Sequence, residues 1–122
     1  MTDGIDLTRD GDLARLTLTR PAKMNAITHE MWSAIPGIVA EVESDPAVKV
    51  LVLTGEGEHF SAGADIGEFR HLRSTPEGVA AYDKAVDAAV DALAGMAKPS
   101  IAMVRGNCIG GGCQPSVACD LR

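Results

Sequence analysis

Two glycine-containing loops are the segments of this chain whose residues are best suited to chemistry. The first runs from His59 to Ile66 and the second from Gly106 to Gln114. Each loop follows an apolar, strand-like run and ends where a helix can begin. A backbone that exposes two N–H groups at such junctions can hold a developing oxyanion, because both groups donate hydrogen bonds to it. The loops therefore favour oxyanion stabilisation by the backbone.

The second loop contains three consecutive glycines, Gly110 to Gly112, which allow a ligand to approach the backbone closely. A helix that begins near Gly112 would point its free N–H groups and its dipole toward that ligand. For a single glycine run, a plain strand-to-helix turn is the favoured explanation. The presence of a second junction of the same kind favours a site, because a thioester oxyanion is best held by two donors.

Other glycine-loop chemistry does not fit the pattern. Pro115 stands where the third glycine of a dinucleotide-binding G-x-G-x-x-G motif belongs, and no Gly-Lys-Ser/Thr follows as in a P-loop. Ser61 is not in a nucleophile elbow, because His59 occupies the position of the first glycine of that motif. The dinucleotide, triphosphate and serine-hydrolase interpretations are thereby excluded.

The segments that must position the loops alternate between strand and helix patterns. Strands are expected at 5–8, 13–19, 48–54 and 100–104, with a turn over 9–12. Helices are expected from the cap Thr28 to about Glu43, over 66–73, and from the capping signature at 74–77 to Lys98-Pro99. Pro36 and Gly37 should kink or split the first helix, because proline removes a helical hydrogen bond. This alternation predicts an α/β fold with parallel strand pairing.

Composition narrows the class of protein further. The chain has 122 residues, enough for one domain, with a net charge of −6 and only 3% aromatic residues, which argues against nucleic-acid or anionic-membrane partners. It has no apolar run of about 18 residues and no basic-then-apolar leader, so the cytoplasm is the expected location. Cys108, Cys113 and Cys119 show no metal-ligand spacing with histidine, and we expect them to fill small spaces in the core.

Several short motifs occur in register over about a hundred residues. They are Arg20-Pro21 with Asn25-Ala26, the strand ending Leu53-Thr54-Gly55, Phe60 to Ile66, Lys98-Pro99, Gly106, Gly110 to Cys113, and Ala118 to Arg122. In order and spacing they resemble the N-terminal half of the crotonase superfamily, the enoyl-CoA hydratases and isomerases. The resemblance implies a crotonase-like spiral of repeated ββα units, apparently truncated. Residues 1–122 would be the N-terminal portion of a single such domain.

The resemblance also implies a site for an acyl-CoA thioester, with coenzyme A entering as part of the substrate and no permanent cofactor or metal. The oxyanion donors would be the N–H groups of Ala64 and Gly111. The loop that wraps coenzyme A would include Ala62, Ala64, Asp65, Ile66 and Gly67, and Asp65 is expected to cap or fix the loop rather than to catalyse. Cations must offset the acidic chain, and Lys23, Arg70 and Arg73 are the candidates, although each equally fits a solvated surface charge. Family members act in fatty acid metabolism, often as lyases, and form trimers or hexamers.

One position departs from the family pattern. Family hydratases hold water with two glutamates, and the first of them falls on Gln114, whose carboxamide cannot act as a general base. Pro115 should bias Gln114 away from helical geometry. The second glutamate would lie beyond Arg122. The sequence therefore leaves open an enolate-handling hydratase or isomerase, a non-catalytic acyl-CoA-binding module, and an inactive truncated fragment.

Overall fold

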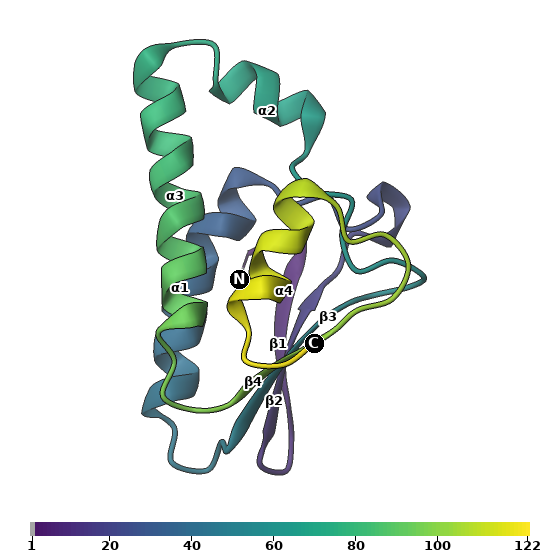
Figure 1. Cartoon of the computed structure of the whole chain (residues 1–122), viewed down its shortest axis with the longest axis vertical. Helices are drawn as coiled ribbons and strands as arrows, with labels where there is room; N and C mark the ends of the chain where they lie inside the picture. Colours follow the sequence, from purple (N-terminus) through teal and green to yellow (C-terminus); the bar gives the residue numbers. More distant parts are fainter. Residues whose placement is uncertain (1) are drawn as a thin grey trace.

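The computed structural model describes residues 2–122 and shows one four-stranded sheet with helices packed on it (Figure 1). The strands are β1 (Ile5–Asp10), β2 (Leu13–Leu18), β3 (Val50–Gly55) and β4 (Ser100–Met103), and they lie side by side in sequence order. β1 and β2 pair antiparallel, whereas β2 with β3 and β3 with β4 pair parallel. The predicted α/β fold with parallel pairing is confirmed.

The β1–β2 hairpin is tighter than the sequence predicts. Arg9 and Asp10 belong to β1, and Asp10 pairs with Leu13 at the end of the ladder. Only Gly11 and Asp12 form the turn, and Gly11 has the positive φ of 63° that this short turn requires. The expected four-residue turn over 9–12 is therefore wrong by two residues, because a glycine in this conformation lets the strands pair up to the turn.

The first long helix, α1 (His29–Ser44), begins where the sequence predicts. The Thr28 hydroxyl accepts a hydrogen bond from the Met31 N–H at 3.2 Å and caps the helix. Pro36 lies inside α1, yet the helix runs unbroken past it, so the expected split is wrong. Burial of one face holds the helix together against the loss of a single hydrogen bond. The buried residues of that face are Met31, Trp32, Ile35, Val39 and Val42.

Two helices follow the first glycine loop. α2 (Ile66–Leu72) is short, and α3 (Pro76–Ala94) is the longest helix of the chain among residues 2–122. The Thr75 hydroxyl accepts the Gly78 N–H at 3.0 Å, which confirms the predicted capping signature. α3 ends four residues before Lys98, because the Gly95 N–H closes the last turn on the Asp91 carbonyl at 2.9 Å. α3 packs along α1, and a buried apolar core fills the space between these helices and the sheet (Figure 1).

A second, smaller set of parallel bridges joins the loops at one end of the sheet. Ile27 pairs with Ala64, and Ser61 pairs with Cys108. The chain then passes through the 3-10 turn η2 (Gly110–Gly112) into α4 (Cys113–Ala118), which confirms a helix beginning near Gly112. After α4, Leu121 pairs with Ile101 beside β4. The two glycine loops are thus neighbours in space as well as similar in sequence.

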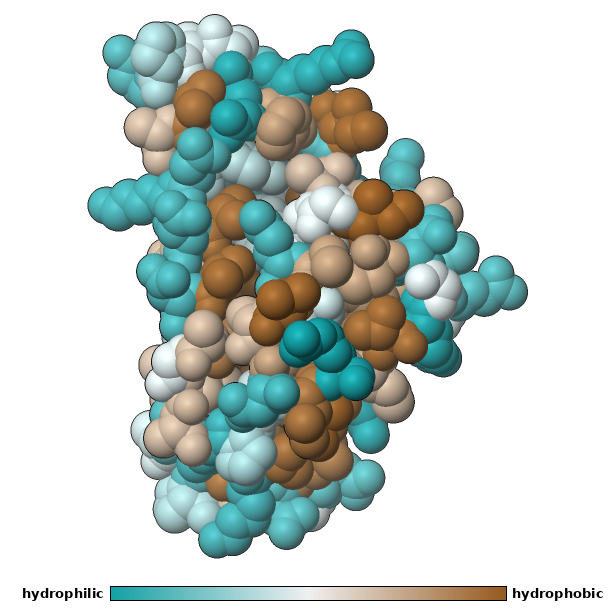
Figure 2. Space-filling model, in the orientation of Figure 1, coloured by the Kyte–Doolittle hydropathy of each residue, from teal (hydrophilic) through white to brown (hydrophobic). Residues whose placement is uncertain are grey.

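Apolar side chains are not confined to the interior. Figure 2 shows them on the face that carries α4, and the exposed ones include Ile109, Val117 and Leu121. Cys119 is buried as expected, whereas Cys108 and Cys113 are only half-buried. No helix among residues 2–122 is long and apolar enough to cross a membrane.

Candidate active site

The first glycine loop is held by a buried asparagine. Asn25 is fully buried, has a φ of 57°, and its side-chain NH₂ donates to the carbonyls of Glu56 at 2.8 Å and His59 at 2.7 Å. Its side-chain oxygen accepts the Arg20 N–H at 2.8 Å, and its carbonyl accepts the Ser61 hydroxyl at 2.9 Å. Asparagine tolerates this left-handed backbone better than most residues. Asn25 therefore fixes both ends of the turn that leads to Ala64.

Arg20 and Asp65 fix the far side of the same loop. One Arg20 nitrogen donates to Asp65 at 2.9 Å, and another donates to the Ala26 carbonyl at 2.7 Å. Asp65 also caps α2 by accepting the Glu68 N–H at 3.2 Å. The hydrogen bond from Glu68, followed by that from Arg20, lowers the pKa of the Asp65 carboxyl from its ordinary value. These contacts support the expectation that Asp65 fixes the loop.

The second loop lies directly against the first. A Cβ on Gly112 would lie 2.6 Å from the Ser61 carbonyl oxygen, and a Cβ on Gly63 would lie 2.9 Å from the Ile109 carbonyl oxygen. The glycines are required here because any side chain would force the two backbones apart. A Cβ on Gly111 would lie only 3.4 Å from the Ala64 nitrogen. The two predicted donor residues are therefore adjacent.

The N–H groups of Ala64 and Gly111 differ from those of the neighbouring glycines in their hydrogen bonding. The Gly63 N–H donates to the Ser61 hydroxyl at 3.1 Å, and the Gly112 N–H donates to the Ile109 carbonyl at 2.8 Å. Within residues 2–122, neither the Ala64 N–H nor the Gly111 N–H has an acceptor. Both residues are half-buried and line the same pocket. Two residues with free N–H donors thus line the same pocket, which is the arrangement that an oxyanion site needs.

That pocket has a volume of about 320 Å³ and lies between α1, the helical segments after the first loop, and the start of α4. Its lining residues are Trp32, Ala64, Phe69, Arg73, Tyr82, Asp83, Val86, Asp87, Gly111 and Gln114. All three predicted catalytic positions, Ala64, Gly111 and Gln114, are among them. A second, more apolar groove of about 350 Å³ continues from it between α3 and α4 and shares Gln114.

Gln114 reaches the pocket from the first turn of α4. The residue is helical, so the expectation that Pro115 would bias it away from helical geometry is wrong. Pro115 occupies the first turn of the helix, where its missing N–H has no helical partner to lose. Gln114 can therefore present its amide to a ligand held by the two loops, and a carboxamide there can orient water or an oxygen through either end.

The other predicted binding residues lie around the first loop. The Ala62 N–H donates to the Met24 carbonyl at 2.9 Å, which places the exposed Lys23 one residue from this contact. Ile66 and Gly67 are exposed in the first turn of α2. Arg73 forms an ion pair with Asp83 and lines the pocket. Lys23 and Arg70 are exposed and make no ion pair among residues 2–122.

The sequence does not predict which residues of the helices line the pocket. Trp32, Phe69 and Tyr82 lie on α1, α2 and α3 and line it, although the residue patterns there predict only helices. One available signal is rarity, since the chain has one tryptophan and one tyrosine. The carboxylates that line the pocket are Asp83 and Asp87. No group of three or more potential metal ligands occurs among residues 2–122.

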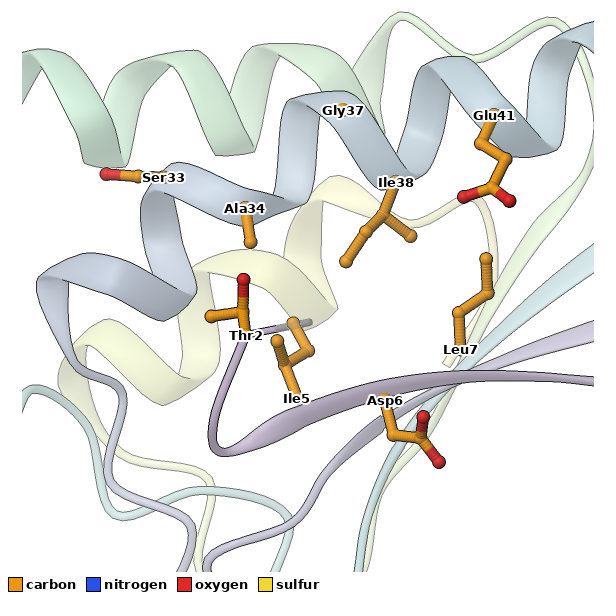
Figure 3. Close-up of a pocket in the computed structure, with 9 residues that line it drawn as sticks. All are labelled: Thr2, Ile5, Asp6, Leu7, Ser33, Ala34, Gly37, Ile38 and Glu41. Carbon is orange, nitrogen blue, oxygen red and sulfur yellow. The ribbon is translucent and has the colours of Figure 1, made fainter.

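A larger hollow, of about 490 Å³, lies elsewhere between α1 and β1. Figure 3 shows Ile5 and Ile38 approaching each other across it, with Glu41 at one end and the Asp6 side chain directed away from α1. None of the predicted site residues lines this hollow. The candidate active site is therefore the smaller pocket at the glycine loops, which is lined by both residues with free N–H groups.

Comparisons with known proteins identify the family of this chain. The family model for enoyl-CoA hydratase/isomerase matches residues 8–122. A hydroxycinnamoyl-CoA hydratase-lyase from Pseudomonas fluorescens is 42% identical over 112 residues, covering 89% of this chain and 41% of that protein. A short-chain-enoyl-CoA hydratase from Clostridium acetobutylicum is 34% identical over 121 residues, covering 98% of this chain and 46% of that protein.

The structural neighbours show the same relationship. The crystal structure of an enoyl-CoA hydratase/carnithine racemase from Magnetospirillum magneticum superposes with a TM-score of 0.92 at 37% identity, covering 98% of this chain and 45% of that one. The chain thus spans less than half the length of these relatives. The fold is a crotonase-like α/β fold over the matched residues. By its sequence and its fold, the chain belongs to the enoyl-CoA hydratase/isomerase family.

Proposed function

We propose that this chain binds an acyl-CoA thioester and stabilises its enolate with the N–H groups of Ala64 and Gly111. The observation that carries the proposal is that these two donors, free within residues 2–122, meet in one pocket. A thioester carbonyl between them gains negative charge when the proton at the adjacent carbon leaves. Each such donor is worth about 3–4 kcal/mol in enzymes where it has been removed.

Gln114 sets the direction of the proposed activity. It occupies the position of the first family glutamate and has no proton to exchange at neutral pH. Enolate chemistry that does not add water, as in isomerisation, therefore fits this chain better than hydration. Asp65 and Glu68 do not replace the base, because Asp65 binds Arg20 and Glu68 accepts the His29 N–H. Asp87 lines the pocket and makes no ion pair among residues 2–122.

A second candidate is a non-catalytic acyl-CoA-binding module, or an inactive truncated fragment. The same free donors support binding, while Gln114 in place of a glutamate favours a site without turnover. The exposed apolar residues around α4 favour the fragment. Poor solubility of the isolated chain, corrected by coexpression with the remainder of a family domain, would support the fragment.

The test is a titration of the purified chain with crotonyl-CoA, with turnover followed in the same sample. Trp32 is the only tryptophan and lines the pocket, so its fluorescence reports binding at this place. Binding with turnover supports the proposed enzymatic function and makes Asp87 the candidate general base. Binding without turnover supports the module. A folded chain, by circular dichroism, that binds no CoA ester refutes the proposal.

The proposed function also concerns the extent of the domain, the contacts with coenzyme A, the assembly of the protein and its location. We infer that residues 1–122 are the N-terminal portion of a single crotonase-like domain, because the relatives are more than twice as long as the matched region. Lys23, Ala62, Asp65, Ile66 and Gly67 are the proposed contacts for coenzyme A. A homotrimer or hexamer, a cytoplasmic location and a role in fatty acid metabolism rest on the family alone. The net charge of −6 speaks against nucleic acid and anionic membranes as partners.

A further inference from the structure

The Arg20 guanidinium joins the two segments that hold the proposed donor Ala64. Its Nη1 donates to the Ala26 carbonyl at 2.7 Å, and its Nη2 donates to the Asp65 carboxylate at 2.9 Å. Ala26 directly precedes Ile27, and Asp65 directly follows Ala64. Ile27 and Ala64 form a parallel bridge with each other. The planar guanidinium therefore holds both sides of the bridge that contains the donor.

Two peptide groups in series connect Arg20 with the Ala64 N–H, and we call them the peptide relay. The first group contains the Ala26 carbonyl and the Ile27 N–H, which donates to the Gly63 carbonyl at 2.8 Å. The second group contains this Gly63 carbonyl and the Ala64 N–H. The C=O and N–H of a planar trans peptide group point in opposite directions, and residues 2–122 contain no cis peptide bond. The Ala64 N–H therefore points away from Ile27.

Further contacts keep the peptide relay in this orientation. The Asp65 N–H donates to the Ile27 carbonyl at 3.0 Å, so the peptide groups on both sides of Ala64 are tied to Ile27. The stem of Arg20 packs closely against Gly4, where a Cβ would lie 2.9 Å from Arg20 Cδ. The Arg20 side chain is only 24% exposed. The guanidinium is thus held in place before any ligand binds.

The charge of Arg20 favours negative charge on a ligand bound at Ala64. Hydrogen bonds in series polarise one another, so a cationic donor at the start of the peptide relay makes the Ala64 N–H a stronger donor. Arg20 also pairs with the Asp65 carboxylate, whose pKa is lowered by the Glu68 N–H and then by Arg20. Without Arg20, this carboxylate would repel an enolate oxygen held at the neighbouring residue.

We propose that Arg20 is a positioning residue for the proposed reaction, because it orients and strengthens the Ala64 N–H through the peptide relay. The inference rests on the proposed function, since it requires a thioester oxygen at Ala64. Arg20 itself makes no contact with the ligand in this role. Its effect is carried by the polarisation of the thioester carbonyl, which a merely stabilising residue does not alter.

The experiment records infrared spectra of crotonyl-CoA with an isotopic label at the thioester carbon, free and bound to the purified chain. Hydrogen bonds to the oxygen lower the stretching frequency of this carbonyl, so we expect a lower frequency in the bound ligand. In Arg20→Gln, which removes the charge and the planar fork, the lowering should shrink by about half, since one of two donors is affected. Arg20→Lys restores the charge without the fork and should give an intermediate value.

The matched control is Arg9→Gln. Arg9 also pairs with an aspartate, Asp45, but it lies near the β1–β2 turn and lines neither pocket at the glycine loops. This variant should keep the carbonyl frequency of the unmodified chain. Calorimetric titration should give dissociation constants within about tenfold of one another for all three variants, because only one ligand hydrogen bond is weakened.

A bound carbonyl frequency in Arg20→Gln equal to that of the unmodified chain would overturn the inference and leave the proposed function standing. An equal change in Arg9→Gln would also overturn it, because the effect would then be a general loosening of the fold. If Arg20→Gln does not fold, Arg20→Lys decides, and an unchanged frequency there has the same meaning. Binding without any lowering in the unmodified chain, or no binding at all, would refute the proposed function itself.

Discussion

The two strand–loop–helix units of this chain look alike in sequence but are stabilised differently. The loop after β3 is held by side chains, with Asn25, Arg20 and Asp65 making hydrogen bonds to several different backbone groups. The loop after β4 is held mainly by backbone contacts with the first loop. The Asn107 carbonyl accepts the Ser61 N–H at 2.9 Å, and the Ile109 N–H donates to the Ser61 carbonyl at 3.2 Å. No side chain caps α4.

Because of this difference, the two units contribute differently to stability and to the proposed function. The first loop is a fixed support that carries one free donor, Ala64. The second loop takes its position from the first and carries the other donor, Gly111, together with Gln114. Damage to the first unit should therefore lower stability and function together. Damage to the second should alter function most, because the rest of the fold does not depend on it.

The largest expected effect is on activity and concerns Gln114. In a longer chain that supplies the second family glutamate, Gln114→Glu should raise crotonyl-CoA hydration by about 10²–10⁴-fold, since it restores a general base. Loss of the enoyl absorbance measures the rate. The matched change in the first unit is Glu68→Gln, which should leave the hydration rate within about threefold, because Glu68 accepts a backbone hydrogen bond rather than lining the pocket. An unchanged rate in Gln114→Glu would show that position 114 is not the altered catalytic position.

The largest expected effect on stability is that of Asn25→Ala. The change removes three side-chain hydrogen bonds at a fully buried residue and leaves their backbone partners unpaired, at a cost of about 3 kcal/mol or more. Urea denaturation measures the free energy of unfolding. Asn107→Ala in the second loop is the control. Its side chain makes only a weak contact with the Met24 sulfur, so the cost should stay below about 1 kcal/mol. Similar losses in both variants would remove the distinction between the loops.

Two alanine substitutions sharpen the role of the second loop. Gly112→Ala forces a Cβ to within 2.7 Å of the Ser61 side chain and should cost about 1–3 kcal/mol. It should also weaken crotonyl-CoA binding, because the Gly111 N–H moves with it. Gly110→Ala meets no atom within 4 Å and should cost only about 1 kcal/mol, for its positive φ of 52°. Urea denaturation measures the loss of stability in both variants, and calorimetric titration measures their affinity for crotonyl-CoA. A larger loss of affinity in Gly110→Ala would contradict the proposed packing.

The smallest expected effect is a pH dependence at Asp65. The pKa of this carboxyl is lower in the folded chain, so its contribution is complete near neutral pH and is lost as the pH falls through the folded-state pKa. Asp65→Asn should cost about 0.5–1 kcal/mol at neutral pH, since asparagine still caps α2 but loses the Arg20 pair. The difference from the unmodified chain should shrink as the pH falls below the ordinary carboxyl pKa of about 4. A difference that is constant with pH would contradict this assignment.

The elements of the fold and their order are largely readable from the sequence. Local signals are strong at Thr28 and Thr75, which cap their helices as predicted, and the alternation of patterns is sufficient to predict a parallel sheet. The errors arise where tertiary packing overrides a local rule. Pro36 does not split α1 because the buried face holds it, and Pro115 is tolerated because it lies in a first turn.

The site is predictable only in part. The glycine loops indicate backbone donors, and the resemblance to the crotonase superfamily points to Ala64, Gly111 and Gln114, which line one pocket. The helical wall of the pocket carries no such signal. Trp32 and Tyr82 are 50 residues apart, and their positions in helices predict burial but not that both line one pocket. The structural role of Asn25 is equally hidden, because its partners come from segments that meet only in the fold.

The order of the strands has a consequence for how the molecule assembles during synthesis. Because β1 to β4 pair in the order in which they are made, each new strand finds its neighbour already in place, and the sheet can grow strand by strand as the chain leaves the ribosome. The pocket at the glycine loops forms later than the sheet. Ala64 can pair with Ile27 early in synthesis, whereas Gly111 reaches its position only after the second loop has emerged and packed against Ser61. We therefore expect a nascent chain to form its sheet before the proposed site at the glycine loops is complete.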